Sequence, residues 1–154
     1  MNPLKLFAFA MIVGPALAIS AVAAPTAPTP QASCSDIRWN PAFLKDYPKA
    51  AAACRDVVVV EGVKYAKFNG KVSKVGQHYV QVAISDVADI PISTVAFEIA
   101  AGGKITVGDK VETVSDLKLG DVLTFWVQEG KFGFSPTLSA EPMKVIKPDS
   151  MPAE

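Results

Sequence analysis

His78 is the residue on which most catalytic chemistry in this chain would depend. It is the only histidine among 154 residues. A hydrolytic site would combine it with a serine nucleophile and a carboxylate within hydrogen-bond reach. Asp86 and Asp89 follow it and are candidate partners, and the candidate nucleophiles are Ser73, Ser85 and Ser93. No G-x-S-x-G elbow marks a nucleophile, so the pattern favours the alternative, an exposed histidine at the start of a strand.

The acidic residues in predicted turns are the next candidates for chemistry, because carboxylate oxygens bind calcium. Asp86 and Asp89 form the densest pair. The D-x-D-x-D-G spacing of a calcium loop is missing. Aspartate is also common in turns because its side chain bonds nearby backbone N–H groups. With a single histidine available for zinc, we expect no metal and no cofactor.

An aromatic group near the C-terminus is the strongest candidate for binding. Leu123, Phe125 and Val127 alternate on one face of a predicted strand, so Trp126 takes the other face, and Phe132 and Phe134 follow in the next loop. If Trp126, Phe132 and Phe134 are exposed, they form a platform for a protein or glycan partner. The alternative is that the helical segment 41–54 covers the Trp126 face.

Four lysines along one predicted strand are the only concentration of positive charge that the sequence suggests. They are Lys64, Lys67, Lys71 and Lys74. Lysines on an edge strand block the addition of further strands, so we interpret them as a solvated edge. The alternative is a site for an anionic ligand.

The first residues of the chain have the pattern of an export signal. Lys5 precedes the apolar run 6–13, and Ala21, Val22 and Ala23 have the small residues that a signal peptidase accepts. The apolar run is shorter than the roughly 20 residues that a transmembrane anchor needs. We therefore predict a signal peptide over residues 1–23 and a periplasmic or secreted protein without a membrane span after cleavage.

Export determines how the cysteines are interpreted. Cys34 and Cys54 are the only two in the chain, and in an oxidising compartment an isolated pair forms a disulfide. Their spacing is far from C-x-x-C, which argues against a redox pair. A disulfide closing about 20 residues would stabilise the fold by roughly 3 kcal/mol.

The length left after export suits one domain. Residues 24–33 are rich in proline, threonine and alanine and are predicted to be a flexible leader. A single domain is expected over 34–147, followed by a flexible tail at 148–154. The 15 basic and 15 acidic residues of the whole chain balance, so charge gives no argument for a nucleic-acid partner. The oligomeric state stays open.

The elements that position these residues are mostly short strands. Asn40 and Pro41 signal a helix start, and the helical cap 41–54 is interrupted by Pro48. Beyond it, valine-rich and alternating segments separated by glycine turns predict six to eight strands, at 57–60, 63–75, 78–84, 93–99, 104–107, 110–114, 122–128 and 143–146. This pattern is typical of a mainly β fold, a small antiparallel OB-like barrel or a sandwich, and the short chain favours a closed or nearly closed barrel.

The second half of the chain resembles a family of uncharacterised exported bacterial small β-barrel proteins of OB-like type. The resemblance rests on the segment SDLKLGDVLTFWV at 115–127 and on the stretches 37–41, 47–50, 62–68 and 132–134. It implies a fold and a compartment, and it implies no activity.

These observations favour an exported, non-enzymatic binding or interaction module with an unknown protein or glycan partner. The alternatives are the small hydrolase or metal-dependent enzyme built on His78, Asp86 and Asp89, and a structural component of an envelope complex.

Overall fold

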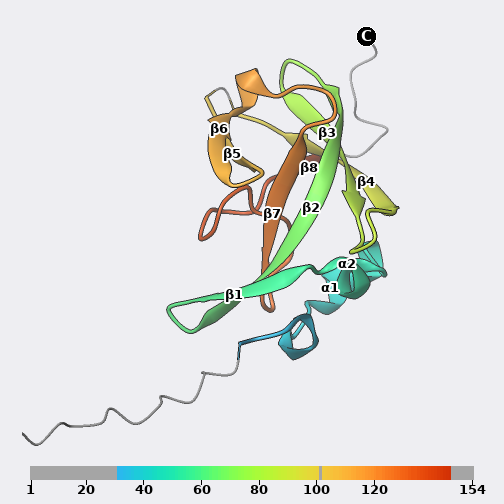
Figure 1. Ribbon diagram of the computed structural model, residues 1–154, viewed down its shortest axis with the longest axis vertical. Coiled ribbons are helices and arrows are strands. Elements are labelled where there is room, and N and C mark those ends of the chain that lie inside the picture. Colours follow the sequence, from blue (N-terminus) through green and yellow to red (C-terminus); the bar gives the residue numbers. More distant parts are fainter. Residues whose placement is uncertain (1–30, 101, 147–154) are drawn as a thin grey trace, which may run out of the picture.

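The computed structural model describes residues 31–100 and 102–146 of the chain (Figure 1). The predicted signal peptide, the predicted tail and most of the predicted leader lie outside the described residues. The helical pieces are short: η1 (Cys34–Asp36), α1 (Pro41–Asp46), α2 (Ala50–Ala53) and η2 (Val114–Asp116). The strands are β1 (Asp56–Val60), β2 (Val63–Val75), β3 (Tyr79–Ser85), β4 (Pro91–Glu98), β5 (Lys104–Val107), β6 (Lys110–Thr113), β7 (Val122–Gln128) and β8 (Val145–Ile146).

All eight strands belong to one antiparallel sheet, in the order β6-β5-β7-β2-β3-β4-β8 with β1 paired to β2. The prediction of a mainly β fold with an N-terminal helical cap is confirmed. The favoured closed barrel is wrong. Closure requires the two end strands to pair, and the described parts of β6 and β8 pair only with β5 and β4. β8 is paired through two residues, so it ends the sheet without closing it.

β2 is the longest strand, with 13 residues, and it organises the sheet. β7 lies along one of its edges through residues 65–71. β1 and β3 follow one another along the opposite edge, at 63–67 and 69–75. The lysines of β2 therefore do not protect a sheet edge, and that interpretation is wrong because strand order is invisible in a single sequence. β1 and the beginning of β2 form a two-stranded arm (Figure 1).

The core lies on the inner face of this sheet. The inward residues of β2, β3, β4 and β7 form one cluster whose largest fully buried members include Phe68, Ile84, Phe97, Leu123 and Phe125. Gly70 belongs to the same inward row. A Cβ there would lie 2.4 Å from Cγ1 of Val82, so any side chain at this position would overpack the core.

The N-terminal cap is fixed to the sheet by a helix start and a disulfide. The Oδ1 atom of Asn40 accepts hydrogen bonds from the backbone N–H groups of Ala42 and Phe43, at 2.9 and 3.3 Å, which begins α1 as predicted. Cys34 and Cys54 form the predicted disulfide, with Cα atoms 5.9 Å apart. The segment between η1 and α2 is thereby held as a loop closed at both ends.

Candidate functional site

The structure does not bring the predicted catalytic residues together. His78 is exposed in the turn before β3, whereas Asp86 and Asp89 lie in the loop after that strand. The seven residues of β3 separate them, and a strand rises about 3.3 Å per residue. A proton could not pass directly between the His78 ring and either carboxylate.

The Asp86 loop instead has a structural role. The Oδ1 atom of Asp86 accepts hydrogen bonds from the backbone N–H groups of Ala88 and Ile90, both at 2.9 Å. Asp89 forms an ion pair with Arg55, whose Nη2 also donates to Ser85 Oγ at 3.2 Å. The loop is thus fastened to the junction between α2 and β1. Within 31–100 and 102–146, no group of three or more His, Cys, Asp or Glu residues could hold a metal ion.

The three predicted aromatic binding residues do not form one platform. Phe134 is 1% exposed and lies in the core. Trp126 is half-buried on the opposite face of the sheet, where the Lys67 ammonium lies 6.0 Å from its ring centroid. Phe132 is 42% exposed. Of the three side chains, Phe132 alone is both exposed and close to the helical cap.

The helical cap covers the inner end of the sheet rather than the Trp126 face. The Phe43 and Tyr47 rings of the cap each lie 5.2 Å from the Phe134 ring. Phe43 also contacts Phe132, at 6.0 Å between centroids, and stacks on Trp39 at 6.1 Å. Phe43 is fully buried, so it links two rings, Trp39 and Phe132, that are partly open to solvent.

The turn after β7 packs against the segment that leads into the cap. The backbone N–H of Gly130 donates to the carbonyl of Arg38 at 2.9 Å. The side-chain amide of Asn40 donates to the carbonyl of Gly130 at 3.1 Å. Residues 38–40 and the turn 128–131 are therefore joined by one main-chain and one side-chain hydrogen bond, although they are about 90 positions apart in the chain.

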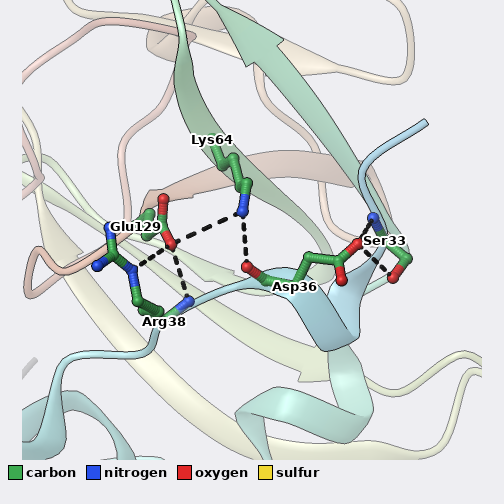
Figure 2. Close-up of polar contacts among 5 residues, drawn as sticks. All are labelled: Ser33, Asp36, Arg38, Lys64 and Glu129. Carbon is green, nitrogen blue, oxygen red and sulfur yellow. Dashed lines mark hydrogen bonds and ion pairs between the residues drawn. The ribbon is translucent and has the colours of Figure 1, made fainter. Parts of the chain in front are cut away.

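A network of charged side chains reinforces this contact (Figure 2). The Oε1 atom of Glu129 accepts from the backbone N–H and the Nε of Arg38, at 3.1 and 3.0 Å, and lies 4.0 Å from Nζ of Lys64. Lys64 also donates to the carbonyl of Asp36 at 2.9 Å. The Asp36 carboxylate accepts in turn from the N–H and hydroxyl of Ser33, at 2.8 and 2.9 Å. The network connects η1, β2 and the turn after β7.

Both carboxylates of this network stay ionised at neutral pH. The hydrogen bonds from the Arg38 side chain and backbone lower the pKa of Glu129, with a smaller contribution from the charge of Lys64. The backbone and hydroxyl hydrogen bonds from Ser33 lower the pKa of Asp36. Each carboxylate is stabilised in its charged form by its hydrogen-bond donors.

Stability should depend on the ionisation of Glu129. Its pKa in the folded protein lies below its ordinary value of 4.5, so its stabilisation is present above that value and is lost as the pH falls through the folded pKa. The glutamine of the Glu129→Gln variant carries no charge that acid could neutralise. We expect the melting temperature of the wild type to exceed that of Glu129→Gln at neutral pH, and the difference to shrink toward zero in strong acid. A difference that stayed constant over this range would contradict the assignment.

A shallow depression lies beside this network, and we call it the Trp39 depression. Its volume is about 500 Å³ and its lining includes Arg38, Trp39, Asn40, Val63, Gln128 and Glu129. The Arg38 side chain is 89% exposed, and among the described residues its terminal nitrogens have no partner. Phe43 and Phe68 cover part of the Trp39 indole, and the remainder lines the depression. An aromatic surface, the two terminal nitrogens of a guanidinium, two amides and a carboxylate meet at one place.

Sequence reasoning did not single out Arg38, Trp39 or Glu129 as site residues. Asn40 was recognised only as a helix cap. The Arg38–Glu129 contact spans 91 positions, and no spacing rule connects residues so far apart. The composition of the triplet at 38–40, a cation, an indole and an amide side by side, is the one local signal that could have found them.

Comparison with known proteins gives no relative for this arrangement: no protein-family model, no curated protein and no solved structure matches the chain. Among the described residues, no helix has the length and apolar character needed to cross a membrane.

Proposed function

We propose that this protein is an exported binding module that recognises a glycan chain in the Trp39 depression. The observation that carries the proposal is the meeting of the Trp39 ring with the planar polar side chains of Arg38, Gln128 and Glu129 in one concave surface. The disulfide supports export, because such bonds persist in oxidising compartments. The resemblance to exported small β proteins agrees with this compartment and stays a prediction.

The chemistry of the depression suits a sugar. A pyranose presents a C–H face that packs on an aromatic ring and hydroxyl pairs that bond to planar polar groups. Trp39 supplies the ring. The terminal nitrogens of Arg38 donate, and the ionised Glu129 carboxylate accepts through its second oxygen, Oε2, which no described residue engages.

The depression is also rigid before any ligand arrives. Glu129 fixes the Arg38 Nε, Asn40 fixes Gly130, and Phe43 supports the Trp39 ring from below. Side chains that are already ordered lose little conformational entropy on binding. The same Phe43 ring also contacts Phe132, so the support of the Trp39 ring extends into the loop after β7.

Binding is favoured over catalysis by the placement of the titratable groups. His78 is separated from Asp86 and Asp89 by the length of β3. The pKa of Glu129 is lowered, whereas a carboxylic acid that donates a proton at neutral pH needs a raised pKa. The Glu129 carboxylate is suited to accept hydrogen bonds from a ligand.

A screen of the purified domain on an oligosaccharide array would test the proposal. We expect the wild type to retain at least one glycan, and Trp39→Ala to weaken that binding at least tenfold, as is common for a central aromatic contact. Trp126→Ala is the matched control, since it removes another partly buried indole, from a different face.

Arg38→Ala provides a second variant in case Trp39→Ala unfolds the protein, because the Arg38 side chain is mostly exposed. It should also weaken binding, and it should lower the melting temperature no further than Glu129→Gln does, because both changes remove the same Arg38–Glu129 pair. A wild type that binds no glycan rejects the proposed ligand class. A glycan bound equally by the wild type, Trp39→Ala and Arg38→Ala rejects the site.

A further inference from the structure

A second hollow lies on the outer face of the sheet, away from the Trp39 depression. Phe68, Gly70 and Val72 of β2 are buried on the inner face, so Asn69 and Lys71 between them take the outer face. The hollow has a volume of about 390 Å³ and crosses β2, β3 and the residues that lead into β7. Its lining includes Asn69, Lys71, Ala83, Ser85, Gly120 and Val122. This volume suits a small molecule rather than a macromolecule.

The polar groups that line this hollow offer donors. The Lys71 side chain is exposed, and its ammonium makes no hydrogen bond or ion pair with any described residue. Ser85 Oγ already accepts from Arg55 at 3.2 Å, which leaves the hydroxyl proton of Ser85 to donate elsewhere. The Oδ1 atom of Asn69 is buried without a partner, so the amide nitrogen is the accessible polar atom of this side chain.

The one carboxylate that also borders the hollow already has a cationic partner. Asp89 is paired with Arg55, and this ion pair neutralises its charge. The ammonium of Lys71 is thus not balanced by the one carboxylate of the lining. Donors with an unbalanced positive charge attract an oxyanion and disfavour a cation.

The Asn69 amide has its oxygen buried and its nitrogen available to the hollow. The buried oxygen without a hydrogen bond destabilises the protein, and this orientation leaves the amide as a donor to the hollow. Asn69 lies beside Ser85 in register and two positions before Lys71, on the same face of β2. Gly120, with φ +91°, leaves space in which a Cβ would lie 3.7 Å from the Lys71 Cε.

We propose that this hollow, which we call the outer-face hollow, binds a small oxyanion, the carboxylate or phosphate group of a small molecule, through Lys71, Asn69 and Ser85. The Lys71 ammonium supplies the charge, and the Asn69 amide and Ser85 hydroxyl orient the oxygens. Ala83 and Val122 provide an apolar floor for the rest of the molecule. This site is independent of glycan recognition at the Trp39 depression.

Amide NMR spectra of the whole mature chain, titrated separately with inorganic phosphate and with acetate, test the site. Sodium chloride at equal ionic strength is the control. We expect saturating shifts at the Asn69 side-chain amide and at the backbone amides of Lys71, Ser85 and Gly120. Saturation by one anion alone identifies the preferred group. Shifts with neither anion, or shifts that chloride reproduces, overturn the proposal.

Two variants separate ligand binding from a structural role. Lys71→Gln should lower the affinity for the anion at least tenfold. Lys110→Gln, which changes an exposed lysine on β6, should leave that affinity unchanged. Asn69→Ala should lower the affinity for the anion, because it removes the amide donor. It should not lower the melting temperature, because it also removes a buried oxygen that has no hydrogen bond. Equal affinity in the wild type and Lys71→Gln would contradict the assignment, and so would a loss of stability in Asn69→Ala with unchanged affinity.

Discussion

Phe134→Ala is expected to lower the free energy of unfolding by about 3–5 kcal/mol, the range for truncating a buried phenylalanine. The ring is 1% exposed. It lies within 6.2 Å, centroid to centroid, of five other rings, those of Phe43, Tyr47, Phe68, Phe97 and Phe125. It therefore joins the helical cap to the inner face of the sheet, and its removal leaves a cavity that stiff neighbours cannot close.

Phe132→Ala is the matched control for this prediction. The same residue type stands two positions earlier in the same loop, but it is 42% exposed. We expect it to lower the free energy of unfolding by less than about 1 kcal/mol. Urea denaturation followed by circular dichroism measures both variants. Equal losses for Phe132→Ala and Phe134→Ala would show that Phe134 does not connect the cap to the sheet.

Removing the disulfide is expected to cost about 3 kcal/mol, because the bond closes a loop between residues 20 positions apart. The double variant Cys34→Ala/Cys54→Ala avoids placing a hydroxyl at Cys54, which is buried. The same bond anchors the segment that carries Arg38 and Trp39, so binding in the Trp39 depression should weaken as well.

Reduction by dithiothreitol provides the comparison for the cysteine variant. The reductant should lower the urea midpoint of the wild type to that of Cys34→Ala/Cys54→Ala and should leave the variant itself unaffected. A wild type whose midpoint does not respond to dithiothreitol, although its thiols become reactive, would contradict a stabilising role for the bond.

The local elements of the fold could be predicted because local chemistry determines them. Asn40 caps α1 and Pro41 begins it. The Glu61–Gly62 turn joins β1 to β2 with φ values of 50° and 80°, the left-handed conformations that a two-residue hairpin needs. The alternation in β7 correctly placed Phe125 inward and Trp126 on the other face.

The arrangement in space could not be predicted, because it depends on contacts between distant residues. No pattern in the sequence states that β2 would lie between β7 and β3, so an interior strand was taken for an edge. Phe134 follows a glycine turn outside any regular strand, and alternation gives no face for it. Its burial follows from the path of the chain after Gly130, which is held by the paired hydrogen bonds between Ser135 and Trp126 and by the bond from the Met143 N–H to the Phe134 carbonyl.

The same limitation applied to the candidate site. Arg38 and Glu129 contribute to one surface only because the cap and the turn after β7 meet, and 91 positions separate them. Phe132 could be proposed as an exposed residue because it is an aromatic residue in a predicted loop. Trp39, which lines the depression, entered the sequence analysis only within the stretch 37–41 that carries the family resemblance.

Tryptophan fluorescence tests the central claim, recognition in the Trp39 depression, most directly. The chain has two tryptophans, so Trp126→Phe leaves Trp39 as the single reporter and Trp39→Phe leaves Trp126. Titration of the Trp126→Phe protein with the oligosaccharides of the array should shift the Trp39 emission in a saturable way, while the Trp39→Phe protein stays silent. An emission from Trp39 that no oligosaccharide changes would contradict the account.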